Sequence, residues 1–204
     1  MKLWKQFEDL KQMIKDDDYL HIVNELTIEC KGLYKNFRDA PAAKYHHHAY
    51  IHGLLEHTVG VTNKALSMAD EATDKDLLIT GALLHDIGKT REYDWSGCTI
   101  TRTNRGKLLG HIVMGCLMIE EVDSRTETTP LEKSIKLLHL IASHHGKKEW
   151  GSPVEPMTKE AIILHQADML DYQMHVIDKA RNEAAEDAEW TGKVNGIGRE
   201  FYLG

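Results

Sequence analysis

The stretch GALLHDIGK, residues 81–89, decides how the rest of the chain is interpreted. Small and apolar residues run directly into a histidine, an aspartate, a glycine and a lysine. A charged carboxylate in an apolar setting is costly unless a counter-charge lies beside it. The sequence therefore predicts a buried helix that ends at a bound cation, with His85 and Asp86 as candidate ligands.

Composition predicts a globular protein with one main domain. The 204 residues suffice for a real core, and 42% of them are hydrophobic and 28% charged. The formal net charge of -7 argues against broad adhesion to nucleic acid or anionic lipid. No stretch approaches the roughly 18 apolar residues of a membrane span, and the first residues lack the apolar centre of a signal peptide. We therefore expect a cytoplasmic protein with no membrane partner.

Apolar periodicity predicts an all-α bundle with one short β-hairpin insertion. Residues 1–40 are expected to form a helical lead-in packed on the core, and residues 41–204 the main domain, including a tail that packs back onto it. The expected hairpin covers residues 93–103, and the expected helices cover residues 19–37, 50–69, 76–86, 108–122, 131–143 and 158–180.

Capping signals predict where several of these helices begin and end. Thr73 and Asp76 resemble a capping box, and Gly88 is expected to close the helix that they open. Thr129 is expected to cap the helix over residues 131–143, ahead of a proline at its first position. Thr158 is expected to open the last long helix.

Histidine is unusually frequent, with 13 in the chain, and imidazole is the commonest metal-ligating side chain. His57, His85 with Asp86, and Asp168 lie on three separate predicted helices among apolar neighbours. One divalent cation would offset the cost of burying all of them. Mixed imidazole and carboxylate donors suit manganese, iron, zinc, nickel or cobalt better than calcium.

A second set of donors, His111, His144 and His145, exceeds what one ion can use. We therefore expect two ions, with the Asp86 carboxylate bridging them. Two ions a few Å apart lower the pKa of a shared water and hold phosphoryl oxygens during displacement. Asp171, one turn after Asp168, is expected to support the site or face the surface rather than bind an ion.

Basic residues gather around these candidate ligands. Between residues 89 and 107, five lysines and arginines face only two acidic residues, and two lysines follow the histidine pair directly. Positive charge beside a metal centre favours a phosphate-bearing substrate. The candidate substrate contacts are Lys89, Arg91, Arg105, Lys147, His47 and His48.

The order His57, His85-Asp86, Asp168 resembles the HD-domain phosphohydrolase superfamily, and His111 with His144 and His145 resembles its two-metal members, which include cyclic-dinucleotide phosphodiesterases. The resemblance implies an all-helical HD-domain bundle. From residue 41 to the end, the chain is most similar to the HD portion of YhaM-type 3′→5′ exoribonucleases. The segments that carry this similarity are PAAKYHHHAYIHGLLEHTVGV, LLHDIGK, GKLLGHI, SHHGKKEWGSPVEPMTKEAIILHQADMLD and REFYLG.

That resemblance implies 3′→5′ degradation of single-stranded RNA or DNA with manganese or a similar ion, release of nucleoside monophosphates, and assembly into oligomers. The resembling enzymes carry an amino-terminal OB-fold, a module that grips single strands, whereas some forty mostly helical residues precede the domain here. Short oligonucleotides or a small or cyclic nucleotide are therefore alternative substrates. A separate OB-fold partner and a homo-oligomer both stay open.

We accordingly predict a metal-dependent phosphodiesterase, with Asp86 and Lys89 as catalytic residues. Two divalent ions are expected, manganese first, with iron, nickel, cobalt, zinc or magnesium as alternatives. Lys89 and the ions would stabilise charge on the phosphate oxygens. The rival interpretations are a diiron oxygenase, which shares a similar ligand set, and a binding module without catalysis.

Overall fold

The computed structural model describes residues 2–29, 37–43, 50–96, 99–126 and 129–204. Within these ranges the regular elements are helices, apart from one short hairpin and an isolated bridge near the carboxyl terminus, which confirms the predicted fold class. The elements follow in this order: α1 (Lys2–Lys11), α2 (Asp17–Asn24), the π-helical turn η1 (Glu25–Glu29), α4 (Gly53–Met68), α5 (Lys75–Leu84), α6 (Lys89–Glu92), β1 (Tyr93–Asp94), β2 (Thr101–Arg102), α7 (Asn104–Thr126), α8 (Leu131–Ser143), the 3₁₀ turn η2 (Lys148–Trp150) and α9 (Lys159–Glu183).

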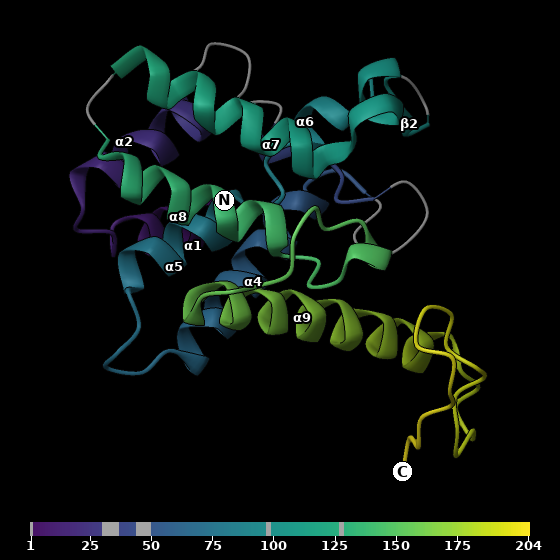
Figure 1. Cartoon of the computed structure of the whole chain (residues 1–204). Coiled ribbons are helices and arrows are strands. Elements are labelled where there is room, and N and C mark those ends of the chain that lie inside the picture. Colours follow the sequence, from purple (N-terminus) through teal and green to yellow (C-terminus); the bar gives the residue numbers. More distant parts are fainter. Residues whose placement is uncertain (1, 30–36, 44–49, 97–98, 127–128) are drawn as a thin grey trace.

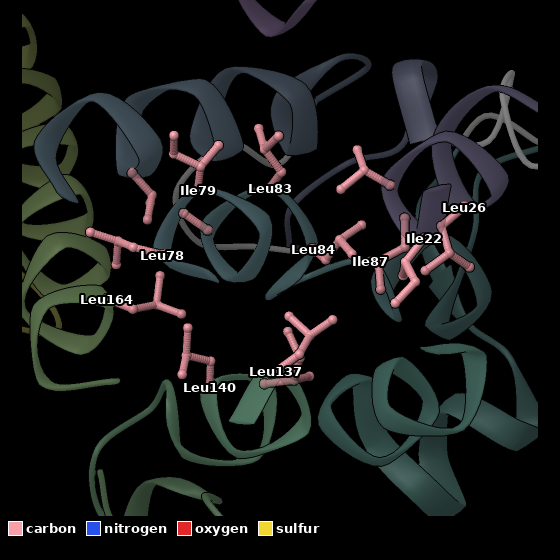
Figure 2. Close-up of a cluster of buried hydrophobic side chains, with 14 of the residues drawn as sticks. Ile22, Leu26, Leu78, Ile79, Leu83, Leu84, Ile87, Leu137, Leu140 and Leu164 are labelled. Atoms are coloured by element: carbon pink, nitrogen blue, oxygen red, sulfur yellow. The ribbon is translucent and has the colours of Figure 1, made fainter. Parts of the chain in front are cut away.

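Helix α5 is the central helix of the bundle, as its nearly uniform apolar sequence predicts. All of its residues from 77 to 84 are buried, and it contacts α4, α8 and α9 as well as both amino-terminal helices. Figure 2 shows Leu78 of α5 beside Leu164 of α9, with Leu137 and Leu140 of α8 close by. Because α5 is surrounded by other helices, His85 and Asp86 at its end also lie inside the protein.

The two amino-terminal helices belong to the same core. Helix α1 buries Phe7 and Leu10 against α4 and α5, and α2 buries Ile22 and Val23 on the side of α5 and α7. The predicted helix over residues 19–37 corresponds to α2 and its π-helical continuation, and residues 30–36 lie outside the described residues. The division of the chain at residue 40 stays a prediction.

The predicted hairpin is present as the pair of strands β1 and β2. They are antiparallel, with Tyr93 opposite Arg102 and Asp94 opposite Thr101. Helix α7 follows the hairpin and bends at Gly110, whose φ of 71° is a left-handed conformation that glycine adopts without steric cost. His111 is therefore the first residue of the second segment of α7, which packs against α6 and α8.

Several predicted helix boundaries were wrong by one to three residues. Helix α4 begins at Gly53 rather than residue 50, because His52 has a φ of 73° and ends the preceding turn. Helix α5 is capped by Asp74, whose carboxylate accepts a hydrogen bond from the Leu77 amide at 3.1 Å. Thr73 does not cap the helix; its hydroxyl is engaged with Asp70, accepting from the amide at 3.1 Å and donating to the carboxylate at 2.9 Å.

Two further capping predictions were wrong and one was confirmed. Gly88 does not close α5 with a left-handed turn; it has a φ of -61° and precedes α6, while α5 ends at Leu84. Helix α8 starts after Pro130 with no side-chain cap, so Thr129 does not cap it. Thr158 does cap α9, because its hydroxyl accepts from the Ala161 amide at 3.2 Å.

The carboxyl-terminal segment leaves α9 and folds on itself (Figure 1). Trp190 and Tyr202 pair across an antiparallel bridge, with ring centroids 5.1 Å apart. The segment then touches α9, where Gly196 lies against the Tyr172 hydroxyl. Among the described residues, none of the helices has both the length and the apolar character needed to cross a bilayer.

Candidate metal centre

The bundle brings the seven predicted ligands together from five helices. His57 lies within α4, His85 and Asp86 follow α5, and His111 follows the bend of α7. The remaining three are the adjacent pair after α8 and one residue within α9: His144, His145 and Asp168. Their ligand atoms form two groups joined by one carboxylate.

The first group consists of His57, His85 and Asp168, whose ligand atoms all lie within 4.8 Å of one another. The His57 Nε2 lies 3.2 Å from the His85 Nε2 and 3.2 Å from the Asp168 Oδ1. The second group consists of His111, His144 and His145, which meets the same 4.8 Å criterion. The composition of both groups, imidazole with carboxylate, fits a divalent transition metal.

The Asp86 carboxylate lies between the two groups, with one oxygen toward each. Its Oδ2 lies 3.5 Å from the His57 Nε2 and 3.4 Å from the His85 Nε2. Its Oδ1 lies 3.3 Å from the His111 Nε2 and 3.7 Å from the His144 Nε2. This is the arrangement that a bridging ligand requires.

All five histidines present the same ring nitrogen to the centre, because the other nitrogen is engaged elsewhere. The Nδ1 atoms of His85, His144 and His145 donate to backbone carbonyls at 2.7 to 2.8 Å, those of Ala82, Ile141 and Trp150 respectively. The Nδ1 of His57 and that of His111 lie 2.7 Å and 3.2 Å from carboxylates. Such partners fix the tautomer and ring orientation that metal ligation needs.

The unpartnered atoms test whether a metal fits. Asp86 Oδ1, His111 Nε2 and His144 Nε2 are buried and have no hydrogen-bond partner among the described residues. A buried polar atom without a partner costs about 1–3 kcal/mol. All three atoms point into the second group, so one ion there would satisfy them together. The residues present therefore fit a metal pair.

The electrostatic environment keeps Asp86 ionised and His144 neutral, the forms in which these side chains ligate a metal. Burial raises the pKa of Asp86, but the Lys89 ammonium, together with His85 and His111, outweighs burial and holds that pKa well below its usual range. Burial lowers the pKa of His144, so its ring is neutral at neutral pH. Burial also lowers the pKa of His57, but hydrogen bonds to Asp168 and Asp171 raise it to about 9. A proton on His57 is thus the cation that a metal would replace.

Each group has one histidine supported by a carboxylate and a basic side chain. Asp171 Oδ2 contacts the His57 Nδ1 at 2.7 Å, and its Oδ1 accepts from the Lys64 ammonium at 2.9 Å. In the second group, Glu92 lies 3.2 Å from the His111 Nδ1 and 3.2 Å from the Arg102 Nε. Asp171 was expected to support the site or face the surface. Glu92 was not predicted, because nothing in the stretch KTREYD, residues 89–94, distinguishes a supporting carboxylate from a surface one.

A cavity of about 390 Å³ opens onto these groups. The candidate ligands His57, Asp86, His145 and Asp168 line one part of it together with Lys89, whose Nζ lies 2.5 Å from the Asp86 Oδ2. Side chains that the sequence did not single out complete the lining: Trp150, Met169 and Tyr172, with Gly196 of the carboxyl-terminal segment. The cavity gives a substrate direct access to the centre.

Of the other predicted substrate contacts, the three that the structure describes, Arg91, Arg105 and Lys147, do not line this cavity. Arg91 lies 3.6 Å from the Glu121 carboxylate, and Arg105 is exposed at the start of α7. Lys147 lies over the Trp150 ring, at 4.6 Å from its centroid, beside a neighbouring cavity. His47 and His48 lie outside the described residues. Their substrate roles stay predictions.

We expect Asp171→Asn to weaken binding at the first group alone. An amide keeps the shape but removes the charge that orients His57, and loss of such a supporting partner typically costs 10–100-fold in metal affinity, on the order of 1.4–2.7 kcal/mol. Calorimetric titration with Mn²⁺ measures both sites. Asp178→Asn, an exposed aspartate on the same helix, is the matched control and should bind normally. Equal affinities in the two variants would contradict the supporting role of Asp171.

The fold and its two ligand groups define the class of protein. The family model of the HD domain matches residues 54–173, so the chain belongs to the HD domain family, as its motifs indicated. Membership implies dependence on a divalent metal, in agreement with the two groups of His and Asp ligands.

Among curated proteins, the chain is similar to the 3'-5' exoribonuclease YhaM of Bacillus licheniformis and of Bacillus subtilis. Each is 43% identical, over 173 and 171 residues, which cover 82% and 81% of this chain but 54% and 53% of the relatives. The YhaM of Listeria monocytogenes is 39% identical over 172 residues, 82% of this chain and 53% of the relative. The chain spans about half the length of the curated relatives it matches. No solved structure matches it.

Proposed function

We propose that this protein is a metal-dependent phosphodiesterase that removes nucleotides from the 3′ end of single-stranded RNA, DNA or short oligonucleotides. The observation that carries the proposal is the Asp86 carboxylate between two histidine groups at the wall of an open cavity. The name 3'-5' exoribonuclease, which relatives about 40% identical carry, favours a nucleic-acid substrate and this direction.

Different residues would perform different parts of such a reaction. Two ions held by the seven ligands would supply a water of lowered pKa and positive charge beside the phosphate oxygens. Lys89 lines the same cavity, and its ammonium has three donors, so it can hold Asp86 and also donate to a phosphate oxygen. The carbonyl and carboxylate partners of the Nδ1 atoms hold the imidazoles in place.

Manganese is the ion that we propose first. The mixed imidazole and carboxylate donor set also suits iron, nickel, cobalt and zinc. We further propose single-stranded nucleic acid as the partner, and we keep a cytoplasmic location, a homo-oligomer and an OB-fold partner as predictions. These points concern the whole protein and need experiments on it.

The direct test uses one oligonucleotide labelled at either end, incubated with the purified chain and Mn²⁺ under anaerobic conditions. We expect a 5′-labelled strand to shorten stepwise, and a 3′-labelled strand to lose its label as a mononucleotide in the first step. Cyclic dinucleotides are assayed in parallel, and hydrolysis of these alone would replace the exonuclease proposal by the small-nucleotide one. Activity that appears only with oxygen would indicate an oxygenase.

A further inference from the structure

A second cavity, of about 420 Å³, adjoins the one that opens onto the metal centre. Both are lined by Trp150 and Met169, so these two side chains form the wall between them. A molecule bound at the metal centre could therefore extend across this wall without leaving the protein surface.

The Trp150 side chain is held in an exposed position. It is 45% exposed, and its ring lies under the Lys147 ammonium, 4.6 Å from the centroid, and 6.2 Å from the His165 ring. The turn that carries it is closed by two backbone hydrogen bonds to the Lys147 carbonyl, from Trp150 at 3.0 Å and from Ser152 at 3.2 Å. An aromatic ring fixed in this way is a platform rather than a core residue.

The same turn supports the metal centre. The Trp150 carbonyl accepts a hydrogen bond from the His145 Nδ1 at 2.8 Å. The indole and one candidate ligand are therefore joined through one hydrogen-bonded turn. A group that stacks on the indole would lie next to the candidate metal centre.

The chemistry of the second cavity suits a nucleobase. Met68, Met169 and Leu170 supply apolar surface, and Gln166 and Gln173 supply amides that both donate and accept hydrogen bonds. Every base has an aromatic face, and stacking on an aromatic side chain tolerates all of them. Lys147, in the same lining, adds positive charge for a neighbouring phosphate.

We propose that Trp150 and this second cavity form a subsite for a nucleobase that flanks the phosphate at the metal centre. The proposal rests on the proposed phosphodiester substrate and deepens it, because it assigns the recognition of the base to residues apart from the metal ligands. Trp150 is then a specificity residue, since substrates that lack a base at this position lose its contribution.

The test combines changes in the protein with changes in the substrate. Trp150→Ala and Trp150→Phe are compared with wild type on an oligonucleotide with all bases, and on two others with an abasic residue at the 3′-terminal or the penultimate position. We expect Trp150→Ala to lower kcat/KM about tenfold through KM, in line with about 1–3 kcal/mol for one stacked base, and Trp150→Phe to keep most activity.

One of the two abasic substrates should be cleaved equally well by wild type and Trp150→Ala. Bound Mn²⁺ should be unchanged in both variants, since the hydrogen bond from His145 is accepted by the backbone carbonyl of Trp150, which both substitutions keep. Lys148→Ala, on the same turn and outside both cavities, is the control and should behave as wild type. A loss in Trp150→Ala that is equal on all three substrates would overturn the base subsite.

A binding experiment distinguishes failure of this subsite proposal from failure of the proposed function. If wild type cleaves no oligonucleotide, the tryptophan fluorescence of the Mn²⁺-loaded chain is titrated with adenosine 5′-monophosphate and with ribose 5-phosphate. We expect quenching by the nucleotide in wild type, none by the sugar phosphate, and none by either in Trp150→Phe. Equal responses to both compounds, or no response in wild type, would refute a base-binding site.

Discussion

Asp86→Asn should leave the protein folded but with at most one of the two ions bound. The two carboxylate oxygens face different histidine groups, at 3.5 Å from the His57 Nε2 and 3.3 Å from the His111 Nε2. An amide has one oxygen acceptor, so it can serve one group at most. Loss of a mere supporting partner costs up to about 100-fold in metal affinity, and loss of a shared ligand should exceed that for at least one ion. Elemental analysis after manganese loading, together with turnover, measures the effect.

Asp86→Ala should also lower the free energy of unfolding. It removes the partner of the Lys89 ammonium, which is buried with its Nζ 2.5 Å from the Asp86 Oδ2. Breaking a buried ion pair from one side costs about 3–5 kcal/mol, because a charge is left uncompensated. Comparing the two variants by circular dichroism separates metal loss from unfolding.

The exposed Asp178→Asn again serves as the control, with two ions and full turnover expected. If Asp86→Asn binds two ions per chain and turns over normally, the bridging assignment is wrong. If the asparagine variant binds one ion with little turnover, the result supports the shared ligand and shows that the two groups depend on Asp86 to different extents.

The sequence was sufficient to predict the parts of the fold that depend on strong local patterns. The apolar run before His85 predicted a helix buried on all sides, and α5 is buried from Leu77 to Leu84. Thr158 could be recognised as a cap because few other polar residues compete there. The sequence could not show that Asp74 rather than Thr73 caps α5, because both residue types cap helices. The choice depends on the contact between Asp70 and the Thr73 hydroxyl.

The grouping of the candidate ligands could be predicted from the sequence, but their supporting partners could not. The candidate ligands are histidines and aspartates among apolar neighbours, and this unfavourable placement can be recognised in the sequence. Their supporting partners are mostly backbone carbonyls, such as those of Ala82, Ile141 and Trp150. Every residue has a carbonyl, so sequence contains no signal for these bonds. The stacking position of Trp150 depends on the path of a loop, which is set by tertiary contacts.

Gly88→Ala should destabilise the protein strongly, because two backbone segments cross at this glycine. A Cβ at residue 88 would lie 2.0 Å from the His111 carbonyl oxygen and 2.8 Å from the Gly115 nitrogen, both in α7. Backbone atoms are unable to change rotamer, so α7 must move away. Overpacking typically costs 1–3 kcal/mol and occasionally more, and we expect at least about 3 kcal/mol here. For a chain of this length, that lowers Tm by about 6–12 °C.

Gly115→Ala is the matched control at the same crossing. Its Cβ would lie 3.4 Å from Ile141 Cγ2 and 3.6 Å from the Gly88 nitrogen, which are ordinary contact distances. An alanine within a helix gains about 0.5–1 kcal/mol over glycine, so Tm should stay within a few degrees or rise. Because displacement of α7 moves His111, Gly88→Ala should also weaken Mn²⁺ binding at the second group, which Gly115→Ala should preserve. Equal melting temperatures in the two variants would show that α6 and α7 do not approach as closely as this crossing requires.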